Sequence, residues 1–365
     1  MDLYNSITYM QDLDNTIDQL TLIKKMEAKS VLVTGATGLI CSAVVDLLLY
    51  YIKRNGSNIK VYAAGRSEEK FNKRFSKYIG EKYLEFVPYD ASKKNNFNFS
   101  CDYVIHGASN AYPSAIQSKP VETMIDNFVG MKELLDYAEQ EKVINTVFIS
   151  SSEIYGKKEN SDPFIEEEYG YIDILNPRSS YSISKLAAET LCTSYYYEKK
   201  VPVSIIRPGH IYGPTASRSD NRISSVFAFD VVDGKDLVMK SDGSQIRSYC
   251  YMIDCATAIL TTLILGKPGE AYNVSNPDSI MTIKEIAECF AKYGGTKLLF
   301  ELPNTTEKAA FNPMSNSSLN SDKLQMLGWK AMFDSQLGTE HTIRVLMEAQ
   351  KKKVVENDHV RRIEE

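Results

Sequence analysis

The sequence contains few of the features that would assign it to a metal-binding, membrane or secreted class. Its six cysteines form no C-x-x-C pair, which disfavours a metal site or a disulfide framework. The longest apolar run, residues 39–52, is too short to span a bilayer and is interrupted by Ser42 and Asp46. No basic segment followed by an apolar stretch opens the chain, so no signal peptide is expected. We therefore expect a cytoplasmic protein with reduced cysteines, no metal and no membrane partner.

An excess of positive charge is also missing. The net charge is -5, which disfavours a nucleic-acid partner. The one basic cluster, Lys351–Lys353, lies in a polar stretch and is interpreted as a solvated helix end. The chain does have 365 residues, 43% of them hydrophobic, enough for one large domain or two smaller ones.

Short apolar segments alternate with helix-length segments over residues 30–207. This alternation is typical of βαβ units and predicts an α/β fold with a doubly wound parallel sheet. Residues 1–28 have apolar residues at helical spacing and predict an amphipathic helical extension. The predicted strands are 30–34, 58–64, 84–88, 102–106, 145–150 and 201–207, and the predicted helices are 39–53, 121–141 and 179–199.

A glycine turn follows the first predicted strand. In Thr34-Gly35-Ala36-Thr37-Gly38, Gly35 permits the turn and Gly38 lets a pyrophosphate approach the N-terminus of the next helix. Position 41 usually holds a third small residue, and Cys41 there brings cofactor affinity into question. The predicted contacts of the dinucleotide at this turn are Gly35, Thr37, Gly38, Leu39 and Ile40.

Further predicted cofactor contacts lie at the ends of the next strands. Gly65 occupies the position where an acidic residue usually binds the ribose of NAD, and Arg66 follows it, which favours NADP over NAD. A second hypothesis is that Arg66 stacks on the adenine. Asp90 and Ala91 are placed to meet the adenine edge, and the small residues Gly107, Ala108 and Ser109 allow close contact with the cofactor.

The pair Tyr181 and Lys185 supplies candidate chemistry. Four residues apart on a helix, the two side chains share one face. A neighbouring ammonium lowers the pKa of a phenol, so the pair predicts an acid or base usable near neutral pH.

Five segments occur in an order that resembles the extended short-chain dehydrogenase/reductases that modify nucleotide sugars. The resemblance covers residues 29–348 and implies a tightly bound, recycled NAD or NADP, also contacted by Asn127, Tyr181, Lys185 and Pro208. It also implies a homodimer formed through two helices per subunit. The segments are residues 34–38, 104–108, 150–156, 181–185 and 207–214.

The domain organisation follows from the same resemblance. It implies a Rossmann domain and a smaller C-terminal substrate-binding domain. We expect the helical extension at 1–28, the Rossmann domain at 29–207 with elements near 225–265 returning to it, the substrate-binding part at 208–348, and a polar tail at 349–365.

The resemblance also assigns roles in the chemistry. Oxidation at sugar C4 would use Tyr181 as base, Lys185 beside it, and Ser151 to orient the same oxygen, with Ser150 and Ser152 as competing assignments for the serine. Glu153 stands where nucleotide-sugar 4,6-dehydratases carry the glutamate that takes the C5 proton, and UDP-glucuronate decarboxylases have a similar segment.

Three outcomes of that chemistry stay open. Ser152 replaces the acidic residue usual in dehydratases, and this difference favours decarboxylation. Epimerization at C4 needs neither that acidic residue nor Glu153. Two further hypotheses are a keto-sugar reductase and a non-catalytic dinucleotide-binding protein. The expected substrate is a nucleoside-diphosphate sugar, with Arg222 and Arg247 suited to its phosphates and Ser152 and His210 as further contacts.

Overall fold

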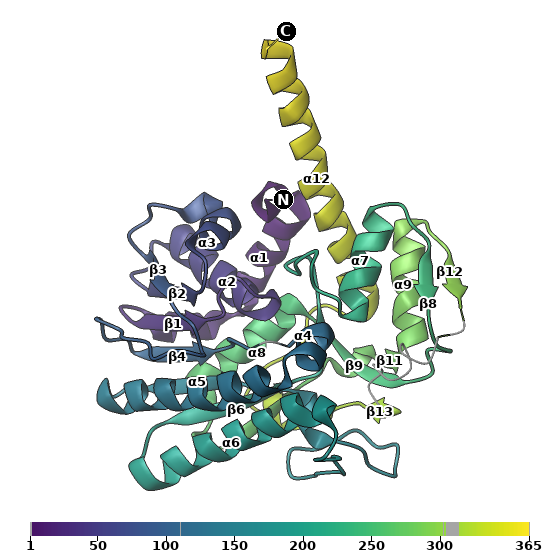
Figure 1. The fold of residues 1–365 in the computed structure, drawn as a ribbon. Coiled ribbons are helices and arrows are strands. Elements are labelled where there is room, and N and C mark those ends of the chain that lie inside the picture. The colour runs from purple at the N-terminus through teal and green to yellow at the C-terminus, as the bar shows by residue number, and fades with distance from the viewer. Residues whose placement is uncertain (1, 110, 302, 304–313, 365) are drawn as a thin grey trace.

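The centre of the structure is a seven-stranded sheet in which all neighbouring strands are parallel (Figure 1). The computed structural model describes residues 2–109, 111–301, 303 and 314–364, and side chains as far as residue 350. The strand order β10-β6-β5-β4-β1-β2-β3 reverses direction between β1 and β4, which confirms the predicted doubly wound fold. The strands are β1 (Ser30–Thr34), β2 (Lys60–Gly65), β3 (Leu84–Pro88), β4 (Tyr103–His106), β5 (Asn145–Ile149), β6 (Val203–Pro208) and β10 (Ala271–Val274).

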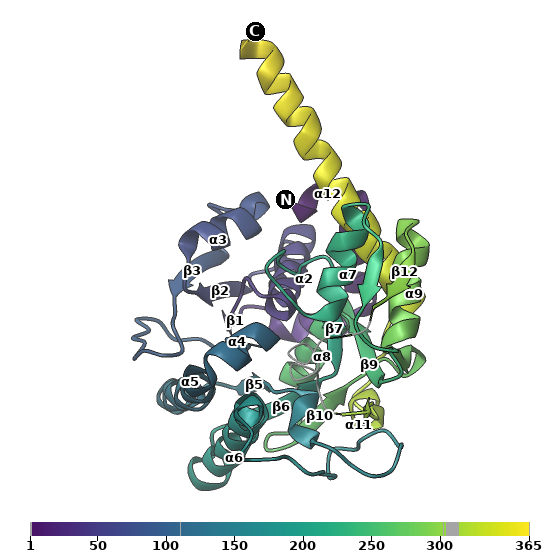
Figure 2. The same cartoon turned by 45° about the vertical axis from the view of Figure 1, so that its right-hand side comes forward.

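Helices cover both faces of this sheet, and the side-chain alternation along β1 shows why. Val31 and Val33 point into one core and Leu32 into the other, so both faces need an apolar cover. Helices α2 and α8 pack together on the first face, and α5 and α6 on the second (Figure 2). The helices are α1 (Ile7–Gln19), α2 (Leu39–Asn55), α3 (Glu68–Arg74), α4 (Pro113–Ser118), α5 (Pro120–Gln140), α6 (Ser180–Lys199), α7 (Ile223–Val232), α8 (Met252–Leu265), α9 (Ile283–Gly294), α11 (Asp322–Gln325) and α12 (Ser335–Glu364).

A smaller group of strands and helices lies at the carboxyl-end side of β6 (Figure 1, right). Its middle strand, β9 (Ile246–Tyr251), pairs with β7 (His210–Tyr212), β11 (Ile280–Thr282) and β13 (Asn316–Ser317), while β8 (Leu237–Met239) pairs with β12 (Leu298–Phe300). Helix α9 begins with a capping box in which Thr282 and Glu285 satisfy each other's backbone N–H. Within 225–265, α8 packs on α2 and the large sheet, whereas α7 packs on α9 and α12.

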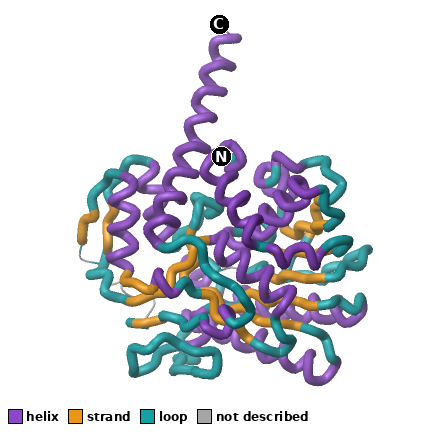
Figure 3. Tube along the Cα trace, turned by 180° about the vertical axis from the view of Figure 1, so that it is seen from behind, coloured by secondary structure: helices purple, strands orange, loops and turns teal. Residues whose placement is uncertain are grey.

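The N-terminal extension consists of α1 between two short 3-10 helices, η1 (Leu3–Asn5) and η2 (Thr21–Met26). It packs against α2, α8 and α12 of its own chain. Figure 3 shows the N-terminal end of the chain beside the C-terminal helix. Its strongest anchor is Asp46, buried on α2, which accepts from the hydroxyls of Tyr4 (2.5 Å) and Tyr9 and pairs with Arg74. The remaining 3-10 helices are η3 (Ser76–Tyr78), η4 (Ser152–Tyr155), η5 (Pro177–Ser179) and η6 (Pro277–Ser279).

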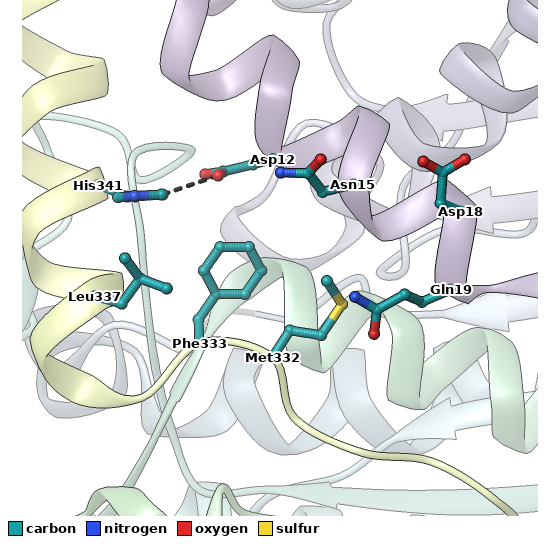
Figure 4. Close-up of a pocket in the computed structure, with 8 residues that line it drawn as sticks. All are labelled: Asp12, Asn15, Asp18, Gln19, Met332, Phe333, Leu337 and His341. Atoms are coloured by element: carbon teal, nitrogen blue, oxygen red, sulfur yellow. Dashed lines mark hydrogen bonds and ion pairs between the residues drawn. The ribbon is translucent and has the colours of Figure 1, made fainter.

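Hydrogen bonds connect the N-terminal extension to helix α12. Glu348 on α12 accepts hydrogen bonds from the Ser6 hydroxyl at 2.6 Å and from the Thr8 N–H and hydroxyl at 3.1 and 3.0 Å. Figure 4 shows Asp12 and His341 facing each other beside a pocket between α1 and the start of α12, with 2.8 Å between Oδ1 and Nδ1. We call this set of contacts the terminal clasp.

The C-terminal helix crosses the predicted start of the polar tail. Helix α12 runs without a break through residue 349, where a separate polar tail is predicted, and its end projects from the body (Figure 1). The interpretation of Lys351–Lys353 concerns side chains outside the described set. No helix within the described ranges is both long and apolar enough to pass through a bilayer.

Candidate active site

The glycine turn lies where the strand order reverses. Gly35 has φ +68°, and a Cβ there would lie 2.9 Å from the backbone of Gly107 and Ala108, so only glycine fits between the ends of β1 and β4. The Gly38 N–H donates to the Gly35 carbonyl at 2.9 Å and directly precedes α2. The N-terminus of α2 therefore lies at the switch point, where a pyrophosphate binds in sheets of this topology. Thr37, Leu39 and Ile40 belong to this turn and to the first turn of α2.

Cys41, which replaces the usual small residue, is accommodated by a missing side chain on the opposite strand end. The Cys41 side chain is buried, and its Sγ would lie 2.3 Å from a Cβ added at Gly107. The glycine thus gives the sulfur its space, and α2 packs closely against the end of β4 in spite of the larger residue.

The ends of β2 and β3 hold the residues predicted to contact the adenosine half. Asp90 accepts from the Ser92 N–H at 3.1 Å and hydroxyl at 2.8 Å; the hydroxyl bond lowers its pKa, and Arg66 contributes in the same direction. Arg66 also acts on Asp126, whose pKa is raised by burial. Both carboxylates therefore lie within electrostatic range of Arg66. The preference for NADP predicted from Arg66 is not confirmed.

Several buried polar atoms on the opposite side of the turn fit a bound dinucleotide. The Asn127 amide donates to the Ser184 hydroxyl at 3.1 Å, while its Oδ1 is buried without a hydrogen-bond partner among the described residues. The Ser109 Oγ is likewise buried without a hydrogen-bond partner among the described residues. Ala91 packs closely against Gly130 of α5, beside Asn127. Since buried polar groups are normally satisfied, these atoms and the glycine cradle suit a polar ligand such as the predicted cofactor.

The predicted catalytic residues come together at the carboxyl end of β5. Ser151 caps η4 by accepting the Glu153 N–H at 3.2 Å. Tyr181 and Lys185 lie in the first turns of α6, and the Lys185 Nζ is 5.9 Å from the centroid of the Tyr181 ring. Both side chains are buried, and Lys185 donates to the Ile149 carbonyl at 2.8 Å. The main chain of β5 therefore fixes the lysine beside the tyrosine.

The pKa of Tyr181 departs from the sequence-based prediction. Burial raises it to about 12, and the Glu153 carboxylate raises it further, whereas a hydrogen bond with Ser151 and the charges of Arg222 and Arg178 lower it. Burial lowers the pKa of Lys185 to about 8. The Tyr181–Lys185 spacing predicts a phenol with a lowered pKa, and that prediction is wrong for the isolated chain, because burial outweighs the lowering contributions.

Arg178 is a site residue that sequence reasoning missed. Its Nη1 and Nη2 donate to the two carboxylate oxygens of Glu153 at 3.0 and 3.1 Å. The two residues are 25 positions apart in sequence, so no local pattern marks the pair. The only signal in the sequence is its position three residues before Tyr181.

Two arginines and a histidine line the side of the site toward the smaller lobe. Arg247 is buried and donates to the carbonyls of Ile246 and Met314 at 2.8 Å each, and no ion pair to it is formed among the residues described. Arg222, at the start of α7, pairs with Asp220 at 2.5 Å.

His210, on β7, is within electrostatic range of both arginines. Burial and the charges of Arg247 and Arg222 lower its pKa to about 3, so it is neutral, and its buried Nδ1 has no partner among the described residues. This group of side chains is suited to an anionic ligand. Pro208 ends β6 next to it, and Ser152 is buried in η4.

The fold and this site define the class of protein. The family model of the NAD dependent epimerase/dehydratase family matches residues 31–275, and the chain belongs to that family. It is accordingly an NAD-dependent enzyme of the extended short-chain dehydrogenase/reductase type.

Individual relatives cover dehydration, decarboxylation and epimerization. The chain is 25% identical over 343 residues to UDP-glucuronic acid decarboxylase 1 of Xenopus tropicalis, covering 92% of this chain and 77% of that protein. It is 25% identical over 327 residues to human dTDP-D-glucose 4,6-dehydratase, covering 87% and 89%. The fold is similar to UDP-glucuronic acid 4-epimerase from Bacillus cereus, solved with UDP-glucuronic acid and NAD, with TM-score 0.72, 21% identity and coverage of 88% and 99%.

Proposed function

We propose that this enzyme converts a nucleoside-diphosphate sugar through a 4-keto intermediate, by 4,6-dehydration or by decarboxylation, with Glu153 acting at the step after C4 oxidation. The observation that carries the proposal is the placement of Ser151, Glu153, Tyr181 and Lys185 around one strand end beside the glycine turn. The Xenopus decarboxylase and the human dehydratase support both outcomes.

The chain's own groups supply binding and proton transfer. Tyr181 takes the proton of the C4 hydroxyl, and Ser151, which hydrogen-bonds to Tyr181, orients the same sugar oxygen. Lys185 holds its position through the Ile149 carbonyl. A bound nicotinamide would supply the hydride acceptor for C4 and the hydride donor for the later reduction. Arg222, Arg247 and the neutral His210 bind the diphosphate side of the substrate.

The two outcomes differ in the bond that breaks after C4 oxidation. In dehydration the Glu153 carboxylate accepts the C5 proton, made acidic by the neighbouring ketone, and passes it to the C6 hydroxyl, which leaves as water. In decarboxylation the C5–C6 bond breaks, carbon dioxide leaves, and C5 takes up a proton. Because NAD is the cofactor of the family and Asp90 and Asp126 both lie within electrostatic range of Arg66, we propose NAD as the cofactor here.

A screen of nucleotide sugars tests the proposal. Purified protein is incubated separately with UDP-glucuronic acid, UDP-glucose, dTDP-glucose, GDP-mannose and CDP-glucose, and the masses of the products are measured by mass spectrometry. Loss of water or of carbon dioxide without added cofactor supports it. A product of unchanged mass indicates 4-epimerization, and turnover only with stoichiometric added reductant indicates a keto-sugar reductase.

We also propose a homodimer formed through α5, and a cytoplasmic location. The support is a row of exposed apolar side chains on α5, among them Val121, Ile125 and Phe128, at the i, i+4, i+7 spacing of one helix face. All six cysteines are free and buried, as suits a reducing compartment. Ile125→Asp is expected to shift the mass measured by light scattering from dimer to monomer, while Met326→Asp, at an exposed position elsewhere, leaves it unchanged.

A further inference from the structure

The Glu153–Arg178 ion pair connects the two segments that carry the chemistry. Glu153 lies in η4, directly after β5, and Arg178 lies in η5, directly before α6 and Tyr181. The two guanidinium nitrogens and the two carboxylate oxygens form a fork at 3.0 and 3.1 Å. A two-pronged pair of this kind fixes the plane and direction of a carboxylate as well as its distance.

The pair differs from an ordinary surface ion pair. The side chains of Arg178 and Glu153 are only 20% and 24% exposed, and the Nε of Arg178 is buried. Solvent-exposed ion pairs contribute little to stability because water competes for both partners. Here the partly covered setting keeps the two groups together, so the direction of the Glu153 carboxylate is set by Arg178 and by the Ser151 cap at its N–H.

The charges of the pair also reach the phenol. The Glu153 carboxylate raises the pKa of Tyr181, and the Arg178 guanidinium lowers it. The two effects oppose each other. The ion pair therefore keeps a carboxylate next to Tyr181, while the guanidinium offsets part of the rise that this carboxylate causes in the pKa of the phenol.

We propose that Arg178 is a positioning residue, whose fork holds the Glu153 carboxylate in the direction required for the step after C4 oxidation. This inference rests on the proposed function. Without the fork, Tyr181 still takes the C4 hydroxyl proton and the hydride still passes to the nicotinamide, but Glu153 is misdirected and the 4-keto intermediate accumulates.

Three variants and one control separate positioning from charge. Arg178→Gln removes fork and charge, Arg178→Lys keeps the charge without the fork, and Glu153→Gln removes the group that is positioned. Arg54→Gln, at a two-carboxylate surface pair on α2, is the matched control. With the nucleotide sugar that the wild type turns over, the reduced cofactor formed in a single turnover reports C4 oxidation, and mass spectrometry reports intermediate and product. Thermal melting checks that each variant is folded.

The expected result is a split between the two steps. Both Arg178 variants should lower product formation by about 10- to 100-fold with C4 oxidation largely kept, since a shift of one reacting group by about 1 Å costs that much. The pH at which C4 oxidation rises should move upward in Arg178→Gln and downward in Glu153→Gln, and stay in place in Arg178→Lys. In the Glu153→Gln background, Arg178→Gln should change product formation by less than about twofold.

Two results would overturn the inference alone: product formation within about twofold of wild type in both Arg178 variants, or independent, multiplying losses in the double variant. Absence of wild-type turnover with every nucleotide sugar would overturn the proposed function, and the inference with it. Loss of C4 oxidation and product together in folded Arg178→Lys would also contradict positioning of Glu153.

Discussion

A methyl group at Gly107 tests whether the glycine turn depends on the space that Cys41 occupies. The added Cβ would lie 2.3 Å from the Cys41 Sγ and 3.1 Å from the Ile149 Cδ1. Non-bonded heavy atoms normally approach to about 3.5–4.0 Å, so the first contact is more than about 1 Å too short. Gly107 has no positive φ, so the penalty is steric only. We expect Gly107→Ala to lower the free energy of unfolding by about 1–3 kcal/mol.

A double-mutant cycle isolates the contact. Cys41→Ala removes the sulfur and should cost about 1 kcal/mol, the value of one buried methylene-sized group. In that background Gly107→Ala should cost less than about 1 kcal/mol, leaving a coupling energy of about 1–2 kcal/mol. The assay is urea unfolding, read as a shift in midpoint at constant slope.

A matched control uses Gly65, where an added Cβ meets no atom within 4 Å. Gly65→Ala should leave the midpoint unchanged or raise it slightly, because alanine reduces the entropy of the unfolded chain. Equal costs of Gly107→Ala with and without the sulfur would refute the argument, because the cost would then not come from the contact with Cys41.

Three further predictions concern other parts of the molecule. Burial raises the pKa of Asp254 to about 7, above its unfolded value of about 4, so its stabilising contribution is complete below about pH 4 and is lost as pH rises through about 7. Asp254→Asn should therefore flatten the fall of Tm over this window, and an unchanged slope would contradict the assignment. Glu348→Ala removes three hydrogen bonds from Ser6 and Thr8 and should cost about 1–3 kcal/mol in urea unfolding; a cost near zero would mean that water replaces them. In titration calorimetry NAD should bind more tightly than NADP, and Arg66→Ala should change NAD affinity by less than about threefold, whereas tighter NADP binding would favour an arginine–phosphate contact.

The strands and the glycine turn could be predicted because their signals are local. The runs before Gly35 and after Asn145 are apolar and β-branched, and the structure has β1 and β5 at those places. The order of the motifs also predicted that Ser151 and Tyr181 meet, since strand ends of a parallel sheet share one edge.

The remaining features depend on contacts between distant residues. The partner of Arg178 is 25 residues away, and the sign of the pKa shift of Tyr181 follows from burial, which spacing does not reveal. The predicted N-terminal helix is interrupted at Leu20, and α12 continues past residue 349. Helix boundaries of this kind are decided by packing more than by propensity.

The terminal clasp has a consequence for synthesis. Thr8 and Glu348 are 340 positions apart, so the segment translated first finds its acceptor only when nearly the whole polypeptide has been made. Until then the apolar side of α1, including Leu13 and Ile17, lacks part of its cover, a state in which nascent chains aggregate or recruit chaperones. A chain that stops before residue 348 keeps the contacts of Tyr4 and Tyr9 with Asp46 but lacks the hydrogen bonds from Ser6 and Thr8, so its opening segment is held by fewer contacts.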